Sequence, residues 1–274
     1  MKIIDAHLHF WPEEDGFTNL ALAAGHENNA EHLEKAYEEL GIVCGIVMGN
    51  RSVDPEDHRY PDFLRYCIGM DSFYLTENDV SESIEALEEN LKRPQCGGIK
   101  LYPGYSPIYV SDPIYEPVYE LAKTYGKPVA VHTGETSMAS AYLKYSHPLS
   151  LDQAAAEHPQ VQFVMCHYGN PWLMDAAAVV SKNPNVAADI SGLLEGRVSL
   201  DVLFEEKRGY MEALRTWMGY LHEYEDILFG TDWPLANLKE YIEFVKRLVP
   251  EKYWEKVFFD NADRIYRLGL KNKA

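Results

Sequence analysis

The chain has 274 residues, of which 46% are hydrophobic, 25% charged and 12% aromatic. This composition is typical of a folded protein of enzyme size and excludes a disordered or fibrous chain. With 43 acidic and 25 basic residues the formal net charge is −18, which disfavours nucleic acid and anionic membrane surfaces as partners.

No apolar run approaches the roughly 20 residues that cross a bilayer. Polar residues at positions 5, 7 and 9 also interrupt the N-terminus before a signal-peptide core could form. The cysteines are widely separated and show no CxxC spacing, so we interpret them as reduced core thiols of a cytoplasmic protein; they are Cys44, Cys67, Cys96 and Cys166.

Short β-branched runs alternate with segments of helical period along the whole chain. In chain order, the predicted strands cover residues 2–6, 42–48, 64–70, 97–101, 128–132, 161–167, 186–190 and 227–231. The predicted helices lie between and after them, at 30–40, 80–91, 114–125, 149–158, 172–182, 209–223, 236–248, 251–259 and 262–268. This alternation is typical of βα units around a parallel sheet.

Eight strands separated by helices favour the (β/α)8 TIM barrel over a doubly wound sheet, which would favour a Gly-rich phosphate turn after its first strand. No GxGxxG motif follows residues 2–6, and no Pro/Ser-rich linker or internal repeat divides the chain. We therefore predict a single TIM-barrel domain over residues 1–274. The loops after the first, fifth and seventh strands are long, and we expect them to form the rim of an active site.

The first strand ends in the sequence Asp5-Ala-His7-Leu-His9. Side chains alternate along a strand, so His7 and His9 should face the same way, as two imidazoles that share a metal must. By the same alternation Asp5 should lie on their side of the strand and orient one of the two rings. This end of the strand is therefore a candidate metal site.

Three later strands also end in residues that bind metals. The fifth ends at His132, the sixth at His167 and the eighth at Asp232. The C-terminal ends of barrel strands meet on one face, which is where barrel enzymes keep their active sites. The remaining histidines, such as His26 and His32, lie away from strand ends, and we interpret them as structural or solvated.

These motifs resemble the amidohydrolase superfamily, in particular its amidohydrolase-related (amidohydrolase 2) branch. In the superfamily's order they are Asp5-Ala-His7-Leu-His9-Phe-Trp, Gly98-Ile-Lys100-Leu-Tyr-Pro, His132-Thr-Gly-Glu, Cys166-His167-Tyr-Gly and Gly230-Thr-Asp232-Trp-Pro, and they span essentially the whole chain. The resemblance implies that one divalent ion, Zn2+ or another, is held by His7, His9, His132 and Asp232. It also implies that His167 is a catalytic histidine that contacts the reacting group.

The number of ions stays open because some members of the superfamily carboxylate a lysine at the end of the fourth strand, which then bridges two metals. Lys100 stands at that place. If the site is binuclear, Lys100 and His167 join the ligands. The amidohydrolase-related branch is largely mononuclear, so we expect one ion per chain.

A zinc ion lowers the pKa of bound water from about 15.7 to about 7, which makes hydroxide available near neutral pH. Asp232 would take the proton of that water, and His167 would assist the developing oxyanion. We therefore predict hydrolysis of an amide, lactone or ester in a small carboxylated or cyclic substrate. The alternative is a non-oxidative decarboxylase, since the branch also contains aminocarboxymuconate-semialdehyde and resorcylate decarboxylases, although these are usually longer chains. A catalytically silent binding protein is a third reading.

Candidate substrate contacts follow the predicted strands. Arg51, after the second strand, is the first candidate to pair with a substrate carboxylate, and Arg197 is the second. Tyr102 and Trp233 follow polar strand ends and could wall the pocket. A homodimer is compatible with the sequence, which does not identify the assembly.

Overall fold

The computed structural model of the chain describes residues 1–49, 52–70 and 80–271. Within these ranges, eight strands pair in parallel and in chain order. They are β1 (Ile3–Leu8), β2 (Ile42–Met48), β3 (Leu64–Met70), β4 (Cys96–Leu101), β5 (Val129–Val131), β6 (Phe163–Met165), β7 (Val186–Asp189) and β8 (Ile227–Leu228). The predicted (β/α)8 barrel, in a single α/β domain, is confirmed.

Backbone hydrogen bonds between the first and last strands bring the sheet close to a closed barrel. The amide of Ala6 donates to the carbonyl of Phe229 at 2.9 Å, and the amide of Asp232 donates to the carbonyl of His7 at 2.8 Å. A parallel bridge also joins Leu8 to Trp233. The end of β8 therefore lies directly beside the end of β1.

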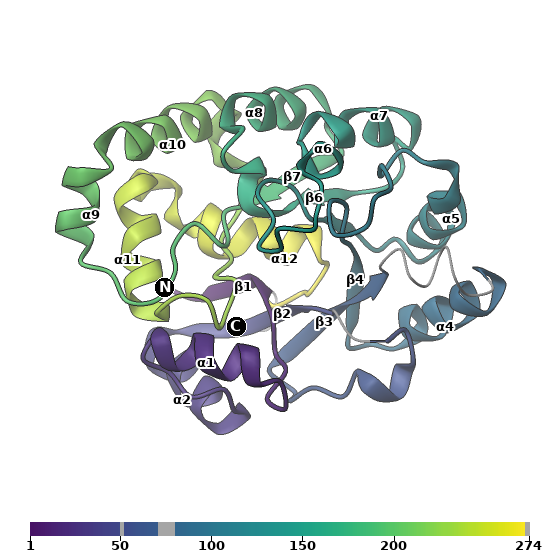
Figure 1. Cartoon of the computed structure of the whole chain (residues 1–274), viewed down its shortest axis with the longest axis horizontal. Helices are drawn as coiled ribbons and strands as arrows, with labels where there is room; N and C mark the ends of the chain where they lie inside the picture. The colour runs from purple at the N-terminus through teal and green to yellow at the C-terminus, as the bar shows by residue number, and fades with distance from the viewer. Residues whose placement is uncertain (50–51, 71–79, 272–274) are drawn as a thin grey trace.

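The helices form an outer ring around the strands (Figure 1). In chain order they are α1 (Asp15–Ala23), α2 (Ala30–Leu40), α4 (Val80–Lys92), α5 (Glu116–Tyr125), α6 (Leu143–Ser146), α7 (Leu149–Glu157), α8 (Leu173–Lys182), α9 (Leu200–Glu206), α10 (Arg208–Tyr220), α11 (Leu238–Leu248) and α12 (Asn261–Ile265). Among the described residues, none of these helices is long and apolar enough to cross a membrane.

Local sequence explains where a typical helix begins and ends. In α2 the side chain of Asn29 accepts a hydrogen bond from the amide of His32, which caps the first turn. Gly41 ends the helix with a positive φ of 75°, a conformation that glycine adopts without steric cost. Between these ends, Leu33 and Tyr37 are buried against the strands. The apolar stripe of α2 therefore packs on the barrel.

Several elements differ from the sequence prediction. Helices α1, α6 and α9 lie in the three long loops, where we predicted no helix. Neither α1 nor α9 has an apolar stripe that the sequence could show, since α1 buries only Ala21 and α9 buries none of its residues. The predicted sixth strand ends early, since a tight turn, Cys166–Gly169, replaces its last residues. At the C-terminus, the two predicted helices are replaced by a 3-10 turn, Glu251–Tyr253, and by a π-helix, Lys256–Asp260, that continues into α12.

The core has an inner and an outer part. Residues inside the barrel, such as Ile46, Val164 and Leu228, form one buried cluster together with residues of the C-terminal segment, including Phe259 and Ile265. The larger cluster packs the strands against the surrounding helices. All four cysteines are buried and free of disulfides. The C-terminal segment thus packs on the barrel interior and leaves the C-terminal ends of the strands for the site.

Candidate metal centre

The structure brings His7, His9 and Asp232 together at the C-terminal ends of the strands. Potential ligand atoms of His7, His167 and Asp232 lie within 4.8 Å of one another. Nε2 of His7 and Nε2 of His9 each lie 3.4 Å from Oδ1 of Asp232. The ring of His167 lies with its centroid 4.8 Å from that of His7 and 5.0 Å from that of His132. The end of β1 and the segments after β5, β6 and β8 therefore lie side by side.

A bulge in β1 decides which side chains face this point. From Asp5 to Leu8 the strand advances three residues while its partner β2 advances only two, from Gly45 to Val47. The extra residue reverses the alternation of side chains. As a result, His7 faces the site whereas the carboxylate of Asp5 faces α2, where it accepts a hydrogen bond from Tyr37 at 2.9 Å.

The expectation that Asp5 orients the ring of a ligand histidine is therefore wrong, since its contact with His7 is to the backbone amide, at 3.4 Å. Its carboxylate instead accepts hydrogen bonds from the backbone amide of Thr231 at 2.9 Å and from its hydroxyl at 2.6 Å. These bonds tie β1 to the segment that carries Asp232. Burial raises the pKa of Asp5 to about 6, against the effect of these hydrogen bonds.

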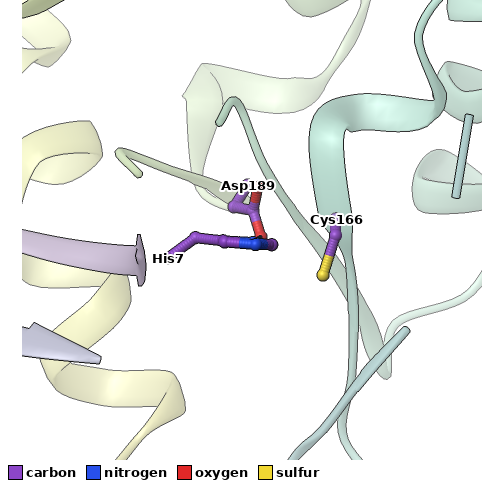
Figure 2. A group of neighbouring side chains, drawn as sticks. All are labelled: His7, Cys166 and Asp189. Atoms are coloured by element: carbon purple, nitrogen blue, oxygen red, sulfur yellow. Dashed lines mark hydrogen bonds and ion pairs between the residues drawn. The ribbon is translucent and has the colours of Figure 1, made fainter. Parts of the chain in front are cut away.

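Asp189, at the end of β7, takes the orienting role. Its Oδ2 lies 2.9 Å from Nδ1 of His7. Figure 2 shows these two side chains together with the nearby sulfur of Cys166. Its other oxygen, Oδ1, accepts from the backbone amide of His167 at 3.0 Å and from the hydroxyl of Ser191. One buried carboxylate thus positions both histidines, in the manner of carboxylate–histidine–metal triads.

Sequence reasoning missed Asp189. The only signal was a single acidic residue within the apolar run Val186-Ala-Ala-Asp189-Ile, at the end of a predicted strand. Such a residue needs a partner when it is buried, and here it is completely buried. A carboxylate inside an apolar strand could therefore have been recognised as part of the site.

The residues fit a metal ion. Three buried atoms have no hydrogen-bond partner among the described residues and belong to the predicted ligands: Nε2 of His7, Nε2 of His132 and Oδ1 of Asp232. His9 contacts the carbonyl of Met48 through Nδ1 at 3.0 Å, which leaves its Nε2 as the lone-pair nitrogen. Two tetrahedral ligands bound at about 2.0–2.1 Å lie about 3.4 Å apart, which matches the measured separations from Asp232. Three imidazoles and a carboxylate suit zinc.

Burial sets the protonation of most of these groups. It lowers the pKa of His9 and of His167 to about 4 each, and holds that of His132 well below its usual value. These three rings are therefore neutral near pH 7, as metal ligands must be.

The carboxylates at the site set the charge of His7. Burial disfavours its charged form, but the carboxylate of Asp189 outweighs burial and raises the pKa of His7 to about 10. Burial also opposes the charge of Asp232, while the neighbouring imidazoles, His7 first, hold its pKa below the ordinary value. Asp189 and Asp232 thus both favour a positive charge at the ring of His7. A divalent ion bound at Nε2 of His7 would supply that charge.

The two residues predicted to be catalytic sit on unusual backbone. Asp232 and His167 both have a φ of 60°, in the left-handed region that non-glycine residues rarely adopt. Gly192, with a φ of 66°, lies so close that a Cβ there would come within 2.8 Å of Asp232 Oδ2 and 2.9 Å of His167 Nδ1. Strained backbone of this kind is typical of functional sites.

Hydrogen bonds determine which nitrogen of His167 carries the proton. Its Nδ1 lies 3.2 Å from the carbonyl of Ser191 and 3.0 Å from the hydroxyl of the same residue. That hydroxyl donates its own proton to Asp189, so both groups act as acceptors toward Nδ1. The neutral ring therefore holds its proton on Nδ1, and Nε2 is left as an acceptor.

A cavity of about 760 Å³ opens onto the site and is lined by His9, His132, His167 and Asp232 among others. Part of the lining comes from α1, where Phe17 stacks on His9 with the ring centroids 5.7 Å apart. Polar lining comes from the loop after β5 and from Glu195 after β7, which confirms that these long loops reach the cavity. The volume suits a small molecule.

Of the two aromatic residues predicted to wall the pocket, Tyr102 lines the cavity and Trp233 does not. Tyr102 lines the cavity, and its hydroxyl donates to the carbonyl of Gly49 at 2.7 Å. Trp233 is completely buried and packs on His26 and His32, outside the set of cavity-lining residues.

Of the two arginines proposed to bind a carboxylate, the structure describes only Arg197. Arg197 also lies outside the cavity lining and forms an ion pair with Glu240 at 2.9 Å on the surface, so it is not available as the predicted second carboxylate partner. Arg51 lies outside the described residues. Lys100 does line the cavity; it is completely buried and its Nζ lies 2.8 Å from Sγ of Cys166.

Comparisons with solved structures support the fold. A 2,6-dihydroxybenzoate decarboxylase from Rhizobium is 16% identical, with a TM-score of 0.70 over 98% of this chain and 99% of that one. An amidohydrolase from Burkholderia multivorans with bound zinc is 15% identical, with a TM-score of 0.68 over 97% and 99%. A probable 2-pyrone-4,6-dicarboxylic acid hydrolase from Acinetobacter baumannii with bound citric acid is 14% identical, with a TM-score of 0.66 over 97% and 100%.

Comparison at the level of sequence gives the family. No curated protein matches the chain. The family model described as Amidohydrolase, of the amidohydrolase 2 branch, matches residues 4–268 and so includes every candidate ligand named above. The chain therefore belongs to the amidohydrolase 2 family of TIM-barrel metal-dependent hydrolases.

Proposed function

We propose that the chain is a metal-dependent hydrolase that cleaves an amide, lactone or ester bond in a small carboxylated or cyclic molecule. The observation that carries the proposal is that Nε2 of His7 and Nε2 of His9 each lie 3.4 Å from Oδ1 of Asp232 beside an open cavity. Nε2 of His132, a residue that lines the same cavity, has no hydrogen-bond partner among the described residues. A bound zinc ion, or another divalent ion, would supply Lewis acidity toward a substrate carbonyl and toward water.

Asp232 is the proposed proton carrier. It stays ionised because the neighbouring imidazoles hold its pKa low, and it lines the cavity where water and substrate enter. A carboxylate in this place accepts the proton of the attacking water and passes it to the leaving group. Asp189 and Thr231 support this role. Asp189 holds the ring of His7, and the backbone amide of Thr231, the residue before Asp232, donates to the carbonyl of His7.

His167 is proposed to act through Nε2. Because Nδ1 keeps its proton toward Ser191, the neutral ring accepts a proton or a hydrogen bond at the cavity and can donate one only after protonation. This refines the sequence-based role of His167 as a direct donor to an oxyanion. Its carboxylate neighbour Asp232, with Oδ2 4.0 Å from Nδ1, would stabilise the protonated ring.

We propose a single ion held by His7, His9, His132 and Asp232. The amine of Lys100 contacts Cys166 and lies 5.1 Å from the ring centroid of Tyr102. That placement supports a single-metal site in which Lys100 is not a ligand, rather than a two-metal site that Lys100 bridges.

Decarboxylation is the second candidate. The Rhizobium 2,6-dihydroxybenzoate decarboxylase shares the fold over 98% of this chain and 99% of its own. Fold and ligand types are shared between the two reactions. The reaction product must therefore distinguish them.

The test is a panel of lactones, cyclic amides and aryl esters beside aromatic and muconate-type carboxylic acids. We expect proton release from ring opening or ester cleavage, without CO₂. Stoichiometric CO₂ with no hydrolytic product would contradict the proposed reaction and leave the metal ligands unaffected.

A variant tests the role of His167. With a single ion, His167→Ala should keep its metal while turnover falls by about 10² or more, the usual scale for an acid–base group. Loss of metal in this variant would instead identify His167 as a ligand and favour the binuclear arrangement.

A further inference from the structure

Asn170 is a cavity residue that the proposed chemistry does not use. It follows the turn Cys166–Gly169 and lines the cavity together with His167. Its backbone amide donates to the carbonyl of His167 at 3.0 Å, and its backbone carbonyl accepts from the amide of Glu135 at 2.9 Å. A Cβ at Gly134 would clash with that carbonyl oxygen. The segments after β5 and β6 therefore hold the backbone of Asn170 in one place.

A tyrosine on α10 holds the side chain of Asn170. The hydroxyl of Tyr210 donates to Oδ1 of Asn170 at 2.8 Å. Burial raises the pKa of Tyr210, and the negative charge of Glu135 raises it further, so the hydroxyl keeps its proton and acts as the donor. Since Glu135 also lines the cavity, its charge favours the amino end of the amide on that side. With Oδ1 bound to Tyr210, Nδ2 is the free end of the amide.

Nδ2 of Asn170 is a donor that makes no hydrogen bond to another group in the described part of the chain. Asn170 is half-buried, and Nδ2 is not one of the fully buried polar atoms, so a ligand in the cavity can reach it. A donor whose other end is already fixed loses little conformational freedom when a ligand binds. The cavity thus offers a pre-positioned hydrogen bond to a group that accepts one.

We propose that Nδ2 of Asn170 donates a hydrogen bond to an uncharged oxygen of the substrate, such as a carbonyl, ether or hydroxyl oxygen, and that Tyr210 is the positioning residue for this bond. The proposal rests on the proposed function, because it assigns the substrate group that is bound in the same cavity. The acceptor is uncharged because Glu135 lies next to this donor, where a carboxylate would meet a like charge. A substrate carboxylate would have to lie elsewhere in the cavity.

N-methyl-2-pyrrolidone is the probe that tests this assignment, because it has one carbonyl acceptor, no hydrogen-bond donor and no charge. Its dissociation constant would be measured by NMR titration of the purified protein labelled with ¹⁵N in asparagine. The side-chain signal of Asn170 is identified by its loss in Asn170→Asp. We expect saturable binding that shifts this signal. Asn170→Ala should weaken binding about two- to tenfold, the usual scale of one hydrogen bond, and Asn170→Asp, which replaces the donor by an acceptor, should weaken it further.

Asn19 provides a matched control. It is exposed on α1, a helix that contributes other residues to the cavity, and it is not itself among the lining residues. Asn19→Asp makes the same chemical change as Asn170→Asp. It should leave the dissociation constant of the probe unchanged.

Tyr210→Phe tests the positioning role. It removes the hydroxyl and keeps the ring, so the amide of Asn170 should rotate more freely and its ¹⁵N signal should move even without ligand. Binding of the probe should weaken less than in Asn170→Ala. The double variant should bind as weakly as Asn170→Ala alone, because Tyr210 acts only through Asn170. A tyrosine with a merely structural role would instead give additive losses.

A further variant tests the charge. Glu135→Gln should strengthen the binding of cyclopentanecarboxylate, an anion of similar size, more than that of N-methyl-2-pyrrolidone, and equal effects would contradict the uncharged acceptor. The proposal is overturned if the probe shows no saturable binding to the wild type, or if the wild type and both Asn170 variants bind it equally. Failure of the proposed function looks different, since hydrolysis would then be missing while binding of the probe still depended on Asn170.

Discussion

Asp189 orients the site although it is not among the residues that line the cavity. Its two oxygens hold Nδ1 of His7 and the backbone amide of His167. Asp189→Asn keeps the size of the residue and removes the charge that orients and polarises His7. We expect metal affinity to fall about 10–100-fold, the usual effect of losing such a partner. Competition with a chromogenic chelator would measure it.

The control for this variant is Asp5→Asn, which also neutralises a completely buried carboxylate, on β1. Asp5 bonds to Thr231 and Tyr37 rather than to an imidazole ring. Its replacement should lower the free energy of unfolding and change metal affinity far less. Equal losses of affinity in the two variants would contradict the assignment of Asp189 as the orienting residue.

A second residue-scale prediction concerns pH. His26 accepts a hydrogen bond from the amide of Leu238 at 3.1 Å and lies 2.9 Å from His32 through its other nitrogen, and burial lowers its pKa to about 4. The unfolded chain takes up this proton near the ordinary value of 6.5. Between pH 6.5 and pH 4 the unfolded state therefore binds more protons, so stability falls as the pH falls.

His26→Gln should flatten this dependence, because glutamine can accept from Leu238 and does not titrate. Urea unfolding at pH 7, 5.5 and 4.5 would give the slopes of the two proteins. Parallel slopes would show that His26 does not remain neutral in the folded state.

At the scale of elements, the bulge in β1 and the loop after β7 shape the centre. Alternation along a strand predicts correctly that His7 and His9 share a site, but it places Asp5 with them because an inserted residue has no signature in this sequence. The bulge is defined by the register in which β1 pairs with β2. The residues of β1 alone show no pattern that predicts this register. Helix α2 shows the opposite case, where Asn29 and Gly41 mark its ends in the sequence itself.

The loop after β7 gives a prediction at this scale. Gly192 has a positive φ, and a Cβ there would displace Asp232 and His167. Gly192→Ala should destabilise the fold by about 1–2 kcal/mol from the backbone conformation alone. It should also weaken metal binding at least tenfold, because Asp232 must move. Thermal melts and chelator competition would measure the two effects separately.

Gly209 supplies the control, since it lies exposed in α10 and a Cβ there would meet no atom within 4 Å. Gly209→Ala should leave metal affinity unchanged and keep or raise stability, by up to about 1 kcal/mol. If both alanine variants bind metal as the wild type does, the close packing of Gly192 on the centre is incorrect.

At the scale of the whole molecule, the order of strands and the place of the site could be predicted, because both follow from features repeated along the chain. Eight β-branched runs predict eight strands, and ligand-type residues at the ends of four of them predict one cluster. Trp233 could not be placed, since its neighbours in space, His26 and His32, come from a distant segment that packs on it only in the folded barrel. Asp189 was hidden for a related reason, because its partners lie on other strands.

The central claim is that His7, His9, His132 and Asp232 together hold one divalent ion, and elemental analysis of the purified protein tests it most directly. We expect about one equivalent of zinc or another divalent metal per chain, its loss from His132→Ala and from Asp232→Ala, and its retention by His147→Ala, which removes a histidine outside the centre. Metal that remains at full occupancy after both His9 and His132 are replaced by alanine would contradict it.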